Sequence, residues 1–111
     1  MSAGALAGEL VDGRLRFSAE AVRAAGLEAV ASCALLREGT DLWLIPLRDA
    51  AHGGFLLKRR NARGDRVLDA ADFFRRNPPA APGLRSLRFD FRPERAAYVA
   101  RHVFESFRQD V

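Results

Sequence analysis

Short apolar segments separated by glycine-containing turns are the feature that most constrains the fold of this chain. Residues 14–17 and 84–91 alternate in polarity with the period of a strand that has one face in the core. Further strand candidates are residues 29–37, 41–47, 55–60 and 66–68. Asp12-Gly13, Glu38-Gly39 and Gly64-Asp65 supply turn signals between candidate strands. The pattern therefore favours an antiparallel sheet of hairpins over a doubly wound parallel sheet.

Three helices are predicted around this sheet. Ser18 has the residue type and position of an N-cap, for a helix that ends near Gly26, and Asp69 that of an N-cap for residues 70–76. Pro93 begins the longest predicted helix, which runs to about residue 108 with an apolar stripe at helical spacing. We therefore expect an α+β fold, with a mainly antiparallel sheet of five to six strands, a C-terminal amphipathic helix and two short helices.

The length of 111 residues suits a single domain spanning residues 1–111, with residues 1–8 flexible and a proline-rich connector at 77–83. The longest uncharged apolar stretches fall far short of the ~18 residues that cross a bilayer, so we expect no membrane partner. Residues 1–10 lack a basic start and contain Glu9, which is unlike a secretory signal. The single cysteine, Cys33, excludes an internal disulfide and fits a cytoplasmic location.

The positive charge is concentrated in the second half of the chain. Residues 1–57 carry a balance of −2, whereas residues 58–76 carry +4 of the total net charge of +4. The candidates for binding an anion or nucleic acid are Lys58, Arg59, Arg60, Arg63 and Arg66, together with Arg14 and Arg16. Guanidinium groups bind phosphate oxygens bidentately, and we expect Arg60, Arg63 and Arg66 to crowd at a hairpin tip.

The arginines of the hairpin, residues 58–66, have a structural interpretation as well. They could pair with carboxylates within the fold or across a dimer, the available partners being Asp41, Asp49, Asp65 and Asp69. In that case the basic segment would be a solvated or ion-paired hairpin without a ligand.

Motifs for catalysis, cofactors and metals are absent from the sequence. Gly53-Gly54 precedes a strand candidate and lacks the residues of a phosphate loop. The two histidines, His52 and His102, lack further ligands at metal-binding spacing, and Cys33 lies in an apolar segment as a small hydrophobe. We therefore predict no catalytic residues, no metal and no cofactor, and a protein that is not an enzyme.

Residues 11–47 resemble the swapped-hairpin domain of AbrB- and MraZ-like bacterial DNA-binding regulators. In that family a Gly-Arg strand leads into a short helix that carries an arginine, followed by a glycine break and a hairpin. Gly13, Arg14, Arg23 and Gly26 match this pattern, while Ser18 replaces the usual proline before the helix. The resemblance implies a dimer in which two chains interleave to bind DNA.

Three hypotheses follow for function. The first is a non-catalytic binding module, a homo-oligomer whose arginine-rich hairpin binds nucleic acid or another anionic partner. The second is a small accessory or scaffolding protein that binds another protein and uses its arginines in salt bridges. The third is an enzyme with a site built between subunits, which would require a deep pocket near His52, Cys33 or Tyr98.

Overall fold

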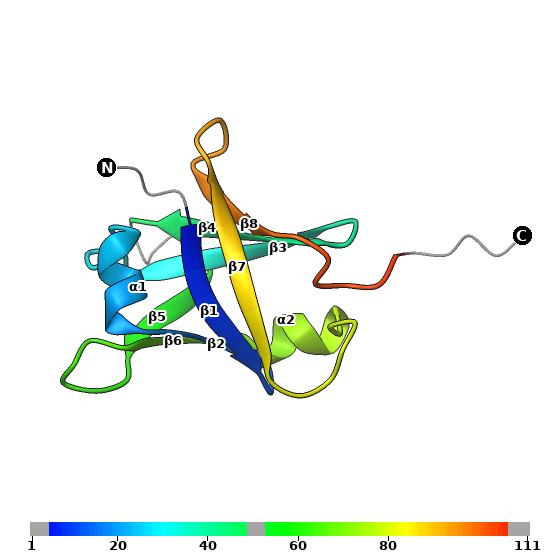
Figure 1. Cartoon of the computed structure of the whole chain (residues 1–111), viewed down its shortest axis with the longest axis horizontal. Helices are drawn as coiled ribbons and strands as arrows, with labels where there is room; N and C mark the ends of the chain where they lie inside the picture. The colour runs from blue at the N-terminus through cyan, green and yellow to red at the C-terminus, as the bar shows by residue number, and fades with distance from the viewer. Residues whose placement is uncertain (1–4, 49–52, 107–111) are drawn as a thin grey trace, which may run out of the picture.

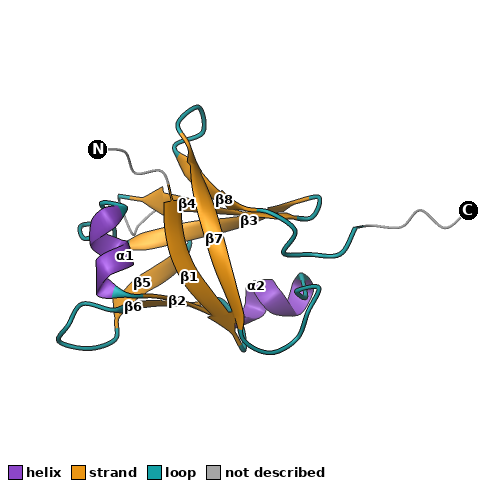
Figure 2. Ribbon diagram, viewed as in Figure 1, coloured by secondary structure: helices purple, strands orange, loops and turns teal. Residues whose placement is uncertain are grey.

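The chain folds into a closed antiparallel barrel of eight strands with two short helices (Figures 1 and 2). This computed structural model describes residues 5–48 and 53–106. The strands are β1 (Ala5–Val11), β2 (Arg14–Phe17), β3 (Ser32–Glu38), β4 (Asp41–Leu47), β5 (Phe55–Arg59), β6 (Arg66–Asp69), β7 (Arg85–Arg92) and β8 (Ala97–Ala100). The helices are α1 (Ala19–Ala24) and α2 (Ala71–Arg76).

The strand order around the barrel is β1-β2-β6-β5-β3-β4-β8-β7, and β7 closes it by pairing with β1. The predicted α+β fold is therefore wrong: the sheet has eight strands instead of five or six, and it curls into a barrel. Hairpins were predicted correctly for β3–β4 and for β5–β6. The sequence interpretation missed β1, whose first residue Ala5 lies in the stretch expected to be flexible.

The predicted C-terminal helix is also wrong. Residues 93–96 form a turn, and Ala97–Ala100 form β8 between β4 and β7. All four residues of β8 are buried, so this strand is covered on both faces and leaves no polar side. Ala96 and His102 have φ of 49° and 60°, outside the right-handed helical region, and they end the strand on either side.

The core consists of the inward-facing residues of the strands together with apolar residues of the helices and loops. The fully buried members with the largest side chains are Phe89, Leu6, Leu15, Leu42, Leu44, Leu68, Val22, Val103 and Cys33. The helices lie on opposite sides of the barrel (Figure 2), and each adds apolar residues to the core, Val22 from α1 and Phe74 from α2. Neither helix in the described ranges is long and apolar enough to cross a membrane.

The two halves of the chain occupy equivalent positions in the barrel. Each half has the element order ββαββ, so that β1 to β4 of the first half correspond in order to β5 to β8 of the second. When each strand is replaced by its counterpart, the strand order around the barrel is unchanged. Four strand pairs join the two halves: β1–β7, β2–β6, β3–β5 and β4–β8. In the β2–β6 pair the register is Leu15↔Leu68. The match is incomplete, because residues 5–10 of β1 pair with β7, whereas β5 pairs with β3 only at Ser32 and Cys33.

Candidate nucleic-acid interface

The loop of residues 60–65 joins β5 to β6 and has a fixed shape. Its ends are closed by the Arg60 N–H, which donates to the Asp65 carbonyl at 2.7 Å. The Asn61 side-chain oxygen accepts from the N–H groups of Gly64 and Asp65, both at 3.2 Å. Hydrogen bonds that an asparagine side chain accepts from nearby backbone N–H groups stabilise tight turns, and Gly64 has a φ of 104° that favours glycine. The loop therefore presents its cations from a defined backbone.

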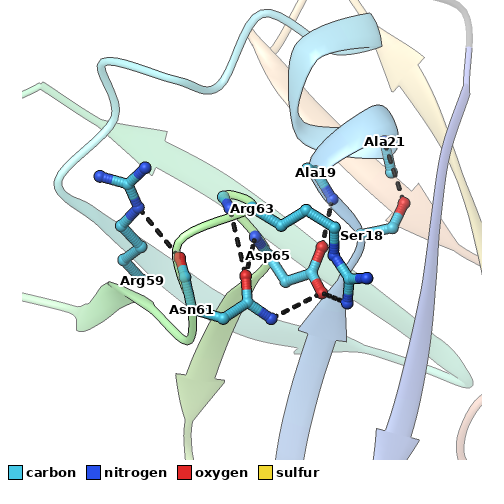
Figure 3. A network of polar contacts seen from close by, with 8 residues as sticks. Ser18, Ala19, Ala21, Arg59, Asn61, Arg63 and Asp65 are labelled. Atoms are coloured by element: carbon cyan, nitrogen blue, oxygen red, sulfur yellow. Dashed lines mark hydrogen bonds and ion pairs between the residues drawn. The ribbon is translucent and has the colours of Figure 1, made fainter.

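Asp65 connects this loop to the first turn of α1. One carboxylate oxygen accepts from the Ala19 N–H at 2.8 Å, while the other accepts from Asn61 Nδ2 at 2.9 Å and from the Arg63 guanidinium at 3.0 Å (Figure 3). The hydrogen bonds from Asn61, Ala19 and Arg63 lower the pKa of Asp65 from 3.8 to about 2. Asp65 is therefore ionised at neutral pH and holds the loop against the helix.

Four of the predicted site residues line one depression on the outer face of β2, β6 and β5. We call it the basic groove and define it by Arg14, Arg16, Lys58 and Arg60; its volume is about 430 Å³. Asp12 and Asp69 also line it, which leaves an excess of two positive charges. Both Arg16 and Lys58 are register neighbours of Val67, so they flank it on the same face of the sheet.

The charges in the basic groove differ in their partners. Arg14 forms an ion pair with Asp69 at 3.6 Å, and Arg16 forms one with Glu9 at 3.1 Å. The pair of Arg14 with Asp69 is solvent-exposed, and such pairs contribute little to stability. Arg16 is half-buried, while the carboxylate of its partner Glu9 is exposed. Within the described part of the chain, the side chains of Lys58 and Arg60 have neither an ion pair nor a hydrogen bond. Of the carboxylates named as partners from the sequence, Asp65 pairs with Arg63 and Asp69 with Arg14, whereas Arg16 pairs with Glu9. Salt bridges therefore do not account for Lys58 and Arg60.

The other three candidates lie on a different side of the loop. Arg59, Arg63 and Arg66 line a pocket of about 210 Å³ together with Arg23 and Glu28, and we call this the arginine pocket. The expected cluster of Arg60, Arg63 and Arg66 at the hairpin tip is thus divided between two surfaces. Arg60 continues the outward-facing side of β5. Arg59, the last residue of β5, lies opposite Arg66, the first residue of β6, in the strand register.

Arg23 belongs to this pocket but was not among the predicted anion-binding residues. It lies in the last turn of α1, far from residues 58–66 in the sequence. A basic residue in the last helical turn has an ordinary role opposite the helix dipole, so its type alone gives no sign of a site. Only the packing of α1 beside the β5–β6 loop brings it to Arg59 and Arg66.

The residues considered for catalysis lie apart. Cys33 is buried, and burial raises the pKa of its thiol to about 12, which keeps it protonated. His102 lies in an exposed turn, whereas Tyr98 is buried and donates its hydroxyl to the Ala25 carbonyl at 3.1 Å. Within residues 5–48 and 53–106, no three His, Cys, Asp or Glu side chains form a group that could hold a metal. His52 lies outside the described residues.

Comparisons with protein-family models, with curated proteins and with solved structures found no match to this chain. The function is therefore argued from the geometry and charge of the chain itself.

Proposed function

We propose that this protein is a non-catalytic binding module that binds nucleic acid through the basic groove. The observation that carries the proposal is the position of Lys58 and Arg60. These two cations, without partners in the described part of the chain, line the same groove as Arg14 and Arg16. Two unpaired cations beside two ion-paired arginines attract a phosphate chain directly, and binding of that chain releases its counterions.

The ion pairs in the groove are compatible with this role. Glu9 and Asp69 pair with Arg16 and Arg14 in the free protein, and both carboxylates are exposed to solvent although Arg16 itself is half-buried. A phosphate oxygen can replace an exposed carboxylate at small cost, because the pair itself is weak. The resemblance of residues 11–47 to AbrB- and MraZ-like domains suggests the same class of ligand.

Fluorescence anisotropy of a labelled duplex across a salt series tests the proposal. With two to four phosphates neutralised, the slope of log K against log salt should lie between about −2 and −4. The double variant K58A/R60A should bind about tenfold more weakly at ~50 mM salt and reduce the slope by about 2. It should weaken binding to unrelated sequences equally, because phosphate contacts carry no base information.

The control variant is R76A/R101A, which removes the same charge at two exposed positions outside the basic groove. It should keep most of the affinity. An equal loss in both variants would mean that net charge alone attracts the duplex. Absence of binding at low salt would reject nucleic acid and leave a protein partner as the explanation for the exposed arginines.

A further inference from the structure

The arginine pocket brings together cations from three separate parts of the chain. Arg23 comes from α1, Arg59 from the end of β5 and Arg66 from the start of β6. Arg63 also lines the pocket, but its guanidinium extends away from Arg59 and pairs with Asp65 (Figure 3). Three arginines then face one carboxylate, Glu28, which leaves an excess of two positive charges.

Two of these guanidinium groups are held in place by backbone carbonyls. Arg59 donates to the carbonyls of Asn61 at 3.1 Å and Ala62 at 3.2 Å, and Arg66 donates to the carbonyl of Glu28 at 3.1 Å. These bonds leave the positive charges uncompensated while they restrict the side chains, so less entropy is lost when a ligand binds.

Arg66 has a further property that favours an oxygen-rich ligand. Its Nε–H is buried and has no hydrogen-bond partner. A buried donor without an acceptor is destabilising, and an acceptor placed near this side chain would reduce that destabilisation. Arg23 has no ion pair or hydrogen bond from its side chain within the described residues, so its guanidinium remains available to a ligand.

We propose that the arginine pocket binds a phosphomonoester, the doubly charged terminal phosphate of a small molecule or chain end. The volume of about 210 Å³ lies below the roughly 300–1,000 Å³ of sites for drug-sized ligands. A phosphate dianion matches the charge excess, and its oxygens accept from guanidinium groups bidentately. This inference does not rest on the proposed function, because the pocket and the basic groove share no residue.

Titrations of the full chain followed by isothermal calorimetry and amide NMR test this site. The probes are inorganic phosphate, adenosine 5′-monophosphate and the diester dimethyl phosphate. The two dianions should bind with Kd below about 1 mM and shift amide signals of residues 19–28 and 59–66, whereas the singly charged diester should bind at least about fivefold more weakly. A stronger response to the nucleotide than to inorganic phosphate would identify a nucleotide end as the source of the group.

Variants separate this site from the basic groove. R23A should weaken phosphate binding at least about fivefold, and E28Q should strengthen it by about twofold, because it removes the only carboxylate that lines the pocket. K58A/R60A should leave phosphate binding unchanged while it weakens duplex binding. The inference is overturned if phosphate shifts no signals of the pocket, if R23A binds as the native chain does, or if the diester binds as tightly as the monoester.

Discussion

The two ββαββ halves of the chain occupy equivalent places in the barrel but differ at their first hairpins. Asp12 and Gly13 join β1 to β2, whereas the longer loop of residues 60–65 joins β5 to β6. Each hairpin contacts the start of the helix of the other half. The Gly13 carbonyl accepts from the Ala70 N–H at 2.9 Å, and the Asp65 carboxylate accepts from the Ala19 N–H at 2.8 Å.

The two hairpins make the equivalent contact to a helix start in different ways, and only one of them leaves space for charged side chains. At Gly13 the contact is made by backbone alone, and the close approach to α2 leaves no space for a side chain. At Asp65 a carboxylate spans the distance to α1, and the loop that carries it also presents Arg60 and Arg63. The six-residue loop between β5 and β6 therefore carries cations, whereas the two-residue turn between β1 and β2 has no space for them.

The largest expected effect lies at the pairing of β2 with β6, one of the four strand pairs that join the two halves. Leu15 and Leu68 are paired across β2 and β6, and both are fully buried. Leu15→Ala and Leu68→Ala should each lower the free energy of unfolding by about 3 kcal/mol, through lost apolar burial and a residual cavity. Urea denaturation measures both, and similar losses would support the equivalence of the halves.

Leu84→Ala is the control for this pair, because Leu84 is 54% exposed. Its effect should stay within about 0.5 kcal/mol. The equivalence would be broken if one core variant were severely destabilised while the other matched Leu84→Ala.

Gly13→Ala should have the next largest effect, because it disrupts the backbone contact of the first hairpin. Gly13 has a φ of 76°, and a Cβ there would lie 2.9 Å from the Cα of Ala71. We expect a loss of about 2–3 kcal/mol in the free energy of unfolding, from strain and displacement of α2.

Gly39→Ala is a matched control in the same denaturation experiment. Gly39 also has a positive φ of 64°, but no atom lies within 4 Å of its added Cβ. This variant carries the conformational penalty alone, about 1 kcal/mol. If the two variants were equally destabilised, close approach to α2 would not be the reason for glycine at position 13.

Asp65→Asn tests the side-chain contact of the second hairpin. The variant keeps a similar shape but loses the charge that accepts from Ala19 and Arg63, so it should be less stable than the native chain at neutral pH. The lowered folded-state pKa means that the stabilisation is present above the unfolded value of 3.8 and is lost as the pH falls towards about 2.

Urea denaturation of both proteins at about pH 5, 4 and 3 tests this prediction. The difference between Asp65→Asn and the native chain should shrink as the pH falls. Asp72→Asn is the control, because it removes an exposed carboxylate that pairs with Arg75 on α2, away from the loop. A difference that stayed constant from pH 5 to pH 3 would contradict the assignment of this contact to the ionised carboxylate.

The sequence predicts the strands of this fold better than its closure. Alternation identifies β2 and β7 because each has one face in the core, and turn residues identify the β3–β4 hairpin. Residues 97–100 mislead because β8 is buried on both faces, and a short buried run has no period to distinguish a strand from a helix. Barrel closure depends on the pairing of β1 with β7, between segments about 80 residues apart that carry no local signal of contact.

The sequence indicates which cations are close together along the chain but not how the fold arranges them. The density of cations at residues 58–66 is visible in the sequence, and all the named residues line one of the two surfaces. Their division follows from strand direction at the barrel end, where Lys58 and Arg60 face outward. The contribution of Arg23 depends on the packing of α1, which the sequence does not specify.

The smallest expected effect concerns the cap of α1, where sequence and structure agree. The Ser18 hydroxyl accepts from the Ala21 N–H at 3.1 Å, as its position predicts, whereas Ala70 and not the expected Asp69 precedes α2 and makes no side-chain cap. Ser18→Ala should lower the free energy of unfolding by about 1 kcal/mol, against almost no change for the exposed strand residue Ser86 replaced by Ala.

Combining Ser18→Ala with Asp65→Asn shows whether α1 is held by its own cap or by the other half of the chain. The two side chains satisfy neighbouring N–H groups of the same helix end, those of Ala21 and Ala19. Residues that share such a network are expected to be coupled, so the double variant should lose a different amount of stability from the sum of the single losses. Additive losses would mean that the loop and the helix cap act independently, and that the contact between the halves does not order α1.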